Sequence, residues 1–165
     1  MDGDQKRLFD RFDELSIKTT THNHAPAFTV EQARELRGTI AGGHCKNLFL
    51  KDKKGALWLI VCLEDARINL KTAPTKIGSA RLSFGKPELL METMGISPGS
   101  VTPFAVINDH DAVVNVILEQ KMMQNGQLNY HPLKNDATTT IATDDLVAFI
   151  KSCGHRVQIV DLDET

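Results

Sequence analysis

The sequence is short of the features that mark several large protein classes. Its 165 residues include three cysteines, one tryptophan and one tyrosine, and aromatic residues make up only 5%. The cysteines, Cys45, Cys62 and Cys153, are odd in number and form no CxxC pair, which favours reduced thiols over a disulfide framework or a zinc site. No apolar run approaches the ~20 residues that span a bilayer. We therefore expect no membrane span and no structural disulfide.

Nucleotide-binding and serine-hydrolase motifs are absent as well. The chain has neither the P-loop pattern GxxxxGKS/T nor GxGxxG, and it has no GxSxG elbow. Its net charge of −2 argues against a protein that coats nucleic acid, but it allows a site that touches a few phosphates. The charged, amphipathic N-terminus carries no apolar signal-peptide core, so we expect a cytoplasmic location.

What the sequence contains predicts an α+β protein, and its length fits a single domain over residues 1–165. Hydrophobic periodicity and capping signals predict helices over 4–15, 29–38 and 143–154, and a helical pattern over 73–95 that breaks near 83–86. β-prone segments predict strands over 18–23, 46–52, 56–63, 103–108, 112–119, 127–133 and 155–162. Hairpin-like strands separated irregularly by helices favour a mixed, barrel-like sheet flanked by helices.

The predicted strand over 46–52 places a lysine on an apolar face. Side chains alternate along a strand, so Lys46 shares a face with Leu48 and Leu50. Burying an ammonium without a partner is costly, so either Lys46 reaches water or an anion meets it there. Cys45 would point to the opposite face, where Lys46 does not reach its sulfur, and this disfavours an activated thiolate.

Two further segments are candidates for chemistry. "HNH" places His22 and His24 on one face of a strand, but the other histidines are scattered, so a metal site is not expected. "GSVTP", from Gly99 to Pro103, joins a glycine to a proline and would present several backbone amides to a carbonyl oxygen or an anion, as an oxyanion hole does. The alternative is an ordinary turn before a strand.

His131 precedes a proline, which favours an extended backbone there; a partly buried structural histidine and a functional one both fit. The chain has one sizeable basic run, which is either a solvated face or a surface that meets a nucleic-acid backbone. Its members are Lys71, Lys76, Arg81 and Lys86.

Five segments together resemble a known family, the YbaK/prolyl-tRNA-synthetase-associated editing domains. They are "HAPAFTVEQA", "GGHCKNLFLKDKKGALWLIV", "RLSFGKPELL", "MGISPGSVTPFAVIND" and "YHPLKNDATTTIATDDLVAFIKSCGH". The resemblance runs from His24 to the C-terminus and is closest to the freestanding prolyl-tRNA editing proteins. It implies a mixed α/β, barrel-like fold that hydrolyses the ester between a wrong amino acid and its tRNA.

The resemblance also implies roles for individual residues. The essential lysine of the family falls on Lys46 and the adjacent asparagine on Asn47. The family's GxxxP loop falls on Gly99, Ser100, Val101, Thr102 and Pro103, and the family histidine on His131. His24 and Phe28 fall in the segment that borders the substrate pocket. Cys45 stands where the family commonly has a threonine or another small residue, which further weakens the thiol hypothesis.

The implied substrate is alanyl-tRNA(Pro), with prolyl-tRNA(Pro) spared and no metal, cofactor or covalent intermediate. Loop amides would hold the carbonyl, Asn47 and His131 would position substrate or water, and Lys46 would meet a phosphate or oxygen charge near the ester. Lys76, Arg81 and Lys86 would contact tRNA(Pro), and prolyl-tRNA synthetase or an elongation factor is a further possible partner. Three alternatives remain open: a cysteinyl, seryl or threonyl ester as substrate, a non-catalytic module that binds the tRNA end, and a thiol- or metal-dependent hydrolase unrelated to tRNA.

Overall fold

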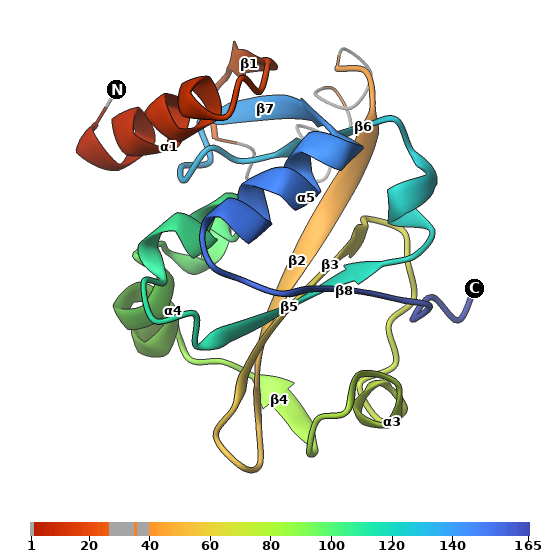
Figure 1. The fold of residues 1–165 in the computed structure, drawn as a ribbon. Helices are drawn as coiled ribbons and strands as arrows, with labels where there is room; N and C mark the ends of the chain where they lie inside the picture. Colours follow the sequence, from red (N-terminus) through yellow and green to blue (C-terminus); the bar gives the residue numbers. More distant parts are fainter. Residues whose placement is uncertain (1, 27–34, 36–39) are drawn as a thin grey trace.

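The computed structural model describes residues 2–26, 35 and 40–165, which form one mixed sheet with helices on both faces (Figure 1). The strands are β1 (Thr19–Asn23), β2 (Gly43–Asp52), β3 (Leu57–Leu63), β4 (Leu82–Phe84), β5 (Val114–Glu119), β6 (Gln127–Tyr130), β7 (Ala137–Ala142) and β8 (Val157–Val160). The α-helices are α1 (Gly3–Glu14), α3 (Ala73–Ile77), α4 (Pro87–Met94) and α5 (Thr143–Ser152). The 3-10 helices are η1 (Pro98–Ser100), η2 (Pro103–Asn108) and η3 (Met122–Gln124).

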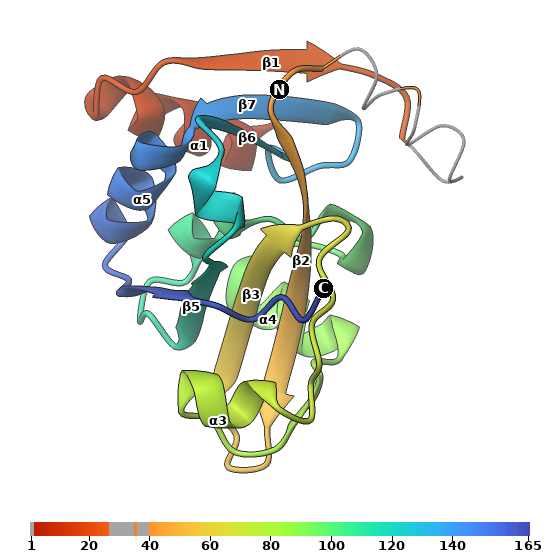
Figure 2. The ribbon, with the colours of Figure 1, turned by 90° about the vertical axis from the view of Figure 1, so that its right-hand side faces the viewer.

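Strand β2 joins the two halves of the sheet. The strand order is β1-β7-β6-β2-β3-β5-β8, and β4 pairs with the far end of β2. Strand β2 runs parallel to β6 at its start and antiparallel to β3 along most of its length. In Figure 2 it passes from the upper half-sheet to the lower one. The predicted mixed α+β fold is confirmed, but no pairing of the described strands joins β1 to β8, so the sheet stays open rather than closing into a barrel.

The two faces of the sheet bury separate apolar clusters. On one face the side chains of α1, α4 and α5 pack together with η2, and the rings of Phe12, Phe104 and Phe149 lie 5.1–5.6 Å apart. On the other face Leu50 and Trp58 pack with α3. Strand alternation explains the division, because neighbouring residues of β2 and β3 fall in different clusters.

Asp52 fixes the end of the β2–β3 hairpin. Its carboxylate accepts hydrogen bonds from the Lys54 and Ala56 amides, the Trp58 indole and the Ala80 amide, at 2.9–3.2 Å. The side chain is buried, and these bonds lower its pKa although burial acts in the opposite sense. One carboxylate thereby ties together the turn, β3 and the segment that leads into β4.

Three sequence predictions need correction or comment. The predicted strand over 103–108 is wrong: it is the 3-10 helix η2, in which Thr102 accepts a hydrogen bond from the Phe104 amide and Pro103 fixes the first φ. The helical pattern over 73–95 resolves into α3, β4 and α4. The helix predicted over 29–38 lies outside the described residues, apart from position 35. None of the helices that the structure describes is long and apolar enough to cross a membrane.

Candidate active site

Lys46 and Asn47 are neighbours on β2, so their side chains lie on opposite faces of the sheet. The Asn47 Nδ2 donates to the carbonyl of Val101 at 3.1 Å, which joins β2 to the loop after η1. Its Oδ1 is buried and, within the described part of the chain, has no hydrogen-bond partner. A flipped amide would set this oxygen against the Val101 carbonyl, so the contact also fixes the orientation of the amide.

The loop from Ser97 to Pro103 is held rigidly. The Ser100 amide donates to the Ser97 carbonyl at 2.9 Å, and Thr102 is fully buried as the N-cap of η2. Val101 ends the single turn of η1, in which each amide points back to the carbonyl three residues earlier. In the predicted oxyanion loop Ser100 is therefore engaged within its own turn, and Val101 directly follows it.

A third segment, the turn between β6 and β7, lies next to this loop. A Cβ placed on Gly99 would lie 3.7 Å from the Nδ2 of Asn135. The Nδ1 of His131 lies 3.0 Å from the Ala137 carbonyl, so this nitrogen carries the proton. Burial lowers the pKa of His131, which leaves the imidazole neutral at pH 7 with Nε2 as an acceptor.

His24 joins the same group from the end of β1. Its Nε2 lies 2.9 Å from the Thr138 hydroxyl, its backbone amide donates to the Asp136 carbonyl, and its ring centre is 6.5 Å from that of His131. Sequence reasoning selected His131 from "HPLKNDATT" but missed Asn135 and Thr138. The density of polar residues after the proline was the signal that could have indicated them.

Asn47 thus contacts the Gly99–Thr102 loop through Val101, and Gly99 faces Asn135 of the β6–β7 turn. His131 is bonded to Ala137 across the same turn, and its ring centre is 6.5 Å from that of His24. Pro103 is buried at the start of η2, behind this loop. Phe28, predicted at the pocket wall, lies outside the described residues.

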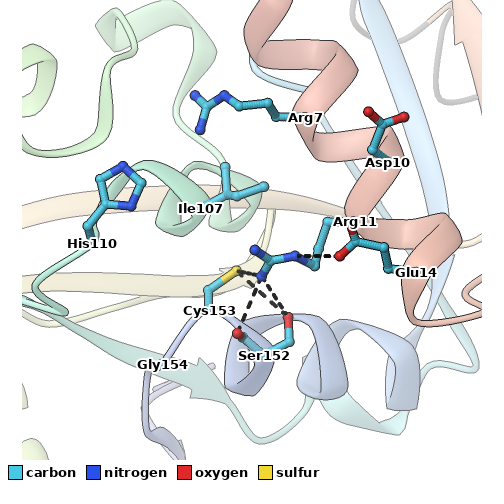
Figure 3. A pocket seen from close by; sticks show the side chains of 9 residues that line it. All are labelled: Arg7, Asp10, Arg11, Glu14, Ile107, His110, Ser152, Cys153 and Gly154. Carbon is cyan, nitrogen blue, oxygen red and sulfur yellow. Dashed lines mark hydrogen bonds and ion pairs between the residues drawn. The ribbon is translucent and has the colours of Figure 1, made fainter.

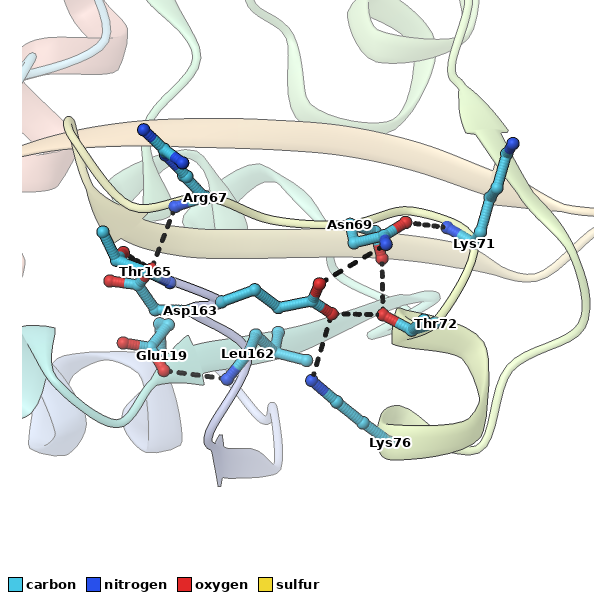
Figure 4. Close-up of polar contacts among 10 residues, drawn as sticks. Arg67, Asn69, Lys71, Thr72, Lys76, Glu119, Leu162, Asp163 and Thr165 are labelled. Carbon is cyan, nitrogen blue, oxygen red and sulfur yellow. Dashed lines mark hydrogen bonds and ion pairs between the residues drawn. The ribbon is translucent and has the colours of Figure 1, made fainter.

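The ammonium of Lys46 lies apart from this group. Its Nζ donates to the carbonyl of Ala66 at 2.6 Å, and Lys46 pairs across the ladder with Cys62. The segment that carries Ala66 is held by the C-terminal residues. The Arg67 amide donates to Asp163 at 3.1 Å (Figure 4). The Glu164 amide donates to the Arg67 carbonyl at 2.9 Å. Hydrogen bonds lower the pKa of Asp163 to about 2, and the largest contribution comes from the Thr165 hydroxyl.

The predicted tRNA-contacting residues differ in their ion pairing. Lys76 on α3 forms an ion pair with Glu164 at 3.5 Å (Figure 4). Arg81 and Lys86 flank β4 and are exposed, and the structure records no ion pair for either among the described residues.

The thiols are poorly suited to nucleophilic catalysis. Burial raises the pKa of Cys45 and of Cys62 to about 12, so both stay protonated at neutral pH. Cys153 lines a different hollow of about 470 Å³ between α1, η2 and the end of α5 (Figure 3). There the Arg11 guanidinium donates to the Ser152 carbonyl and hydroxyl at 3.3 Å and contacts the Cys153 sulfur, and burial raises the pKa of this thiol as well. These contacts tie α1 to α5.

Metal-binding side chains do not gather in the part of the chain that the structure describes. No group of three or more histidine, cysteine, aspartate or glutamate residues is placed to hold an ion there. The "HNH" pair is divided between an exposed His22 and a His24 that is bonded to Thr138.

The family model of the aminoacyl-tRNA editing domain matches residues 24–149, which include all three segments of the candidate site. The chain belongs to this family. The editing domain is 34% identical to the prolyl-tRNA editing protein ProX of Acetoanaerobium sticklandii over 164 residues, which cover 98% of this chain and 100% of that protein.

A second relative is the prolyl-tRNA synthetase associated domain-containing protein 1 of Bos taurus, 33% identical over 95% of this chain and 94% of that protein. The editing domain also superposes on the crystal structure of a proposed trans-editing enzyme for prolyl tRNA synthetase. The TM-score is 0.75 at 19% identity, over 100% of this chain and 99% of the other. At this identity the structural match establishes the fold alone.

Proposed function

We propose that the protein hydrolyses the ester of mischarged alanyl-tRNA(Pro) without a metal and spares correctly charged prolyl-tRNA(Pro). The observation that carries the proposal is the contact between Asn47 and Val101, which fixes the family loop beside β2, with Asn135 facing Gly99. The relatives are named for prolyl-tRNA editing and for association with prolyl-tRNA synthetase, which supports tRNA(Pro) as the carrier.

The loop supplies the electrostatic part of the mechanism. An aminoacyl ester is already activated, so the main demand is to stabilise the oxyanion of the tetrahedral intermediate, an effect worth about 3 kcal/mol per donor in hydrolases. The Val101 amide, at the end of η1, is the donor that we propose, because Val101 is held beside β2 by Asn47 while Ser100 is engaged within its own turn. The exposed face of Gly99 leaves room for the carbonyl to approach.

A water molecule is the nucleophile. The neutral imidazole of His131 offers Nε2 as an acceptor, since its Nδ1 donates to Ala137. The buried Oδ1 of Asn47 needs a donor, because an unsatisfied buried acceptor costs roughly 1–3 kcal/mol. An enclosed water molecule meets this need, and through it Asn47, like His131, helps to position the reactants.

Lys46 acts on the RNA rather than on the ester. Its ammonium lies on the face of β2 opposite the Asn47–Val101 contact, so a phosphate of the terminal adenosine is a better partner for it than the developing oxyanion. A point charge on a flexible stem can leave the Ala66 carbonyl and meet that phosphate.

Size accounts for the choice between alanine and proline. A cavity fitted to a methyl group accepts the proline ring only by overpacking, which typically costs about 1–3 kcal/mol. That cost corresponds to roughly 5- to 150-fold discrimination. The pocket thereby acts as a second sieve after a synthetase that cannot reject the smaller amino acid well enough.

The test is a parallel time course with alanyl-, seryl-, cysteinyl-, threonyl- and prolyl-tRNA(Pro) at one enzyme concentration, with and without EDTA. We expect rapid loss of the alanyl ester, a stable prolyl ester and no effect of the chelator. Equal cleavage of the prolyl ester would refute the sieve. Cleavage of only the seryl, cysteinyl or threonyl ester would change the substrate, and no cleavage of any ester, with tRNA still bound, would leave a binding module.

A further inference from the structure

The carbonyl that accepts the Lys46 ammonium is held in place by bonds on both sides of it along the chain. The Nζ of Lys46 donates to the Ala66 carbonyl at 2.6 Å. Ala66 is buried just after β3, and its own amide donates to the Leu63 carbonyl at 3.0 Å. The next amide, of Arg67, donates to the Oδ1 of Asp163 at 3.1 Å (Figure 4). Ala66 is therefore fixed to the sheet on one side and to a carboxylate from a distant part of the sequence on the other.

Lys46 and Asp163 bind opposite ends of a single peptide unit. The unit joins Ala66 to Arg67, and because the described residues contain no cis peptide bond, its C=O and N–H point in opposite directions. An ammonium at the oxygen and a carboxylate at the N–H polarise the unit in the same sense, so each hydrogen bond strengthens the other. The direction of the carbonyl, and with it the place of the Lys46 Nζ, therefore depends on Asp163.

The carboxylate of Asp163 is itself fixed. Its side chain is only 8% exposed, and its Oδ2 lies 3.7 Å from the Nζ of Lys121. Hydrogen bonds, of which that from the Thr165 hydroxyl contributes most, lower the pKa of Asp163 to about 2, so it is ionised at neutral pH. The preceding amide, of Leu162, donates to the buried carboxylate of Glu119 at 2.9 Å (Figure 4). Asp163 can therefore act as a fixed, charged acceptor.

The neighbouring carboxylate, of Glu164, has a different task. It accepts a hydrogen bond from the Thr72 hydroxyl at 2.6 Å and lies 3.5 Å from the Nζ of Lys76, so it ties the chain to α3. The part of Glu164 that holds the Arg67 segment is its backbone amide, which donates to the Arg67 carbonyl at 2.9 Å. A change of the Glu164 side chain keeps that bond, whereas a change of the Asp163 side chain can remove the bond to the peptide unit. The two adjacent acids therefore form a matched pair for substitution.

We propose that Asp163 is a positioning residue for Lys46, on which it acts through the peptide unit between them. The inference rests on the proposed function for the role of Lys46, the binding of an RNA phosphate. An ammonium has three N–H donors, so Lys46 need not give up Ala66 completely when it meets that phosphate. A lysine side chain has many rotamers, and a carbonyl that already holds its Nζ reduces the freedom that RNA binding must remove. Asp163 should therefore affect the affinity for the substrate and not the chemical step.

The first experiment measures KM and kcat for alanyl-tRNA(Pro) in three variants. Asp163→Ala removes the acceptor and should raise KM roughly tenfold, about the effect of freeing one lysine side chain, with kcat unchanged. Asp163→Asn keeps an oxygen at the Arg67 amide without the charge and should retain most of the affinity. Asp163→Glu keeps the charge but moves the oxygen by one methylene, so KM should rise. A loss in Asp163→Asn as large as that in Asp163→Ala would overturn the proposal.

Glu164→Gln is the matched control. It weakens the contacts with α3 but leaves the backbone amide that binds Arg67, so KM should keep its wild-type value. Urea unfolding of the same preparations checks that each variant is folded. An equal rise of KM in Glu164→Gln and Asp163→Ala would mean that any loosening of this segment suffices, and it would overturn the specific role of Asp163.

A double-mutant cycle tests whether Asp163 acts through Lys46. In the Lys46→Met background, Asp163→Ala should have no further effect on kcat/KM, because no ammonium remains to be positioned. A residue that only stabilises the fold would cause the same loss in both backgrounds, and that result would overturn the proposal.

The last measurement needs no substrate and so separates this inference from the proposed function. The Nζ signal of Lys46 is followed by NMR in protein with isotope-labelled lysine, with Lys46→Met for assignment and the exposed Lys18 as reference. In the wild type the ammonium protons of Lys46 should exchange with water more slowly than those of Lys18, and Asp163→Ala should remove the difference. An unchanged Lys46 signal in that variant would overturn the proposal. If the signal responds but the protein cleaves no aminoacyl ester, the proposed function fails and the positioning role stands.

Discussion

Gly99→Ala separates the role of the loop in catalysis from its role in folding. Gly99 is exposed and its φ is not in the left-handed region, and a Cβ there would meet only the Asn135 amide at an ordinary 3.7 Å. Nothing in the described structure therefore requires glycine for folding. Because alanine restricts the unfolded chain, the free energy of unfolding should rise by about 0.4–1 kcal/mol.

The same methyl group should inhibit the reaction, because it occupies the face on which the carbonyl of the ester is proposed to lie. Loss of one oxyanion donor typically lowers kcat by about 10²–10³-fold, and we expect a fall of that order in alanyl-tRNA(Pro) hydrolysis. Urea unfolding and single-turnover deacylation are measured on the same preparations. Gly126→Ala, where a Cβ meets nothing within 4 Å, is the control and should keep its activity. A stable Gly99→Ala variant with wild-type kcat would refute the assignment of this loop.

Three further predictions concern Lys46, Cys45 and His131. Lys46→Met should lower kcat/KM more than tenfold. The free energy of unfolding should change by no more than about 1 kcal/mol, since the variant loses the hydrogen bond to the Ala66 carbonyl. A variant with more than a tenth of wild-type activity would contradict the role of Lys46. Cys45→Ser should keep near-normal activity, because the thiol stays protonated, and inactivation of a folded variant would restore the thiol hypothesis. The pKa of His131 is lowered in the folded state, so the unfolded state binds the proton more readily. The free energy of unfolding should therefore fall as the pH drops below about 6.5. The fall should be smaller in His131→Gln, and identical pH profiles of the variant and the wild type would contradict this prediction.

The local signals in the sequence were sufficient for most of the fold. The alternation in β2, the apolar run of β3 and the helical period of α5 are properties of neighbouring residues, and the structure has these elements where they were predicted. The predicted cap of α5 is wrong, because the N-cap is Ala142 and makes no side-chain hydrogen bond among the described residues. The strand predicted over 103–108 is wrong because β-branched and aromatic residues are equally suited to a buried 3-10 helix. The packing of this segment against α1, α4 and α5 determines its conformation, and no local sequence pattern reports that packing.

The open sheet could not be predicted for a similar reason. Closure depends on whether β1 and β8 meet, and these strands come from opposite ends of the chain. The family resemblance gave the composition of the sheet but not the pairing of its last strands.

The position of the Lys46 ammonium is the clearest feature of the site that the sequence could not predict. Alternation correctly places Lys46 on the face of Leu50, yet the atom that holds its Nζ is the Ala66 carbonyl, beyond the end of β3. That carbonyl keeps its place because the next amide, of Arg67, is bound by Asp163 at the other end of the chain. The ammonium of Lys46, a residue of the β2 motif, is therefore positioned by the backbone at Ala66 and by the C-terminal carboxylate of Asp163, both far from that motif in the sequence. Since Val101 separately fixes the Asn47 side of β2, the two neighbours are held by independent contacts. The Lys46 charge that we propose binds RNA can therefore move without disturbing the face that we propose meets the ester.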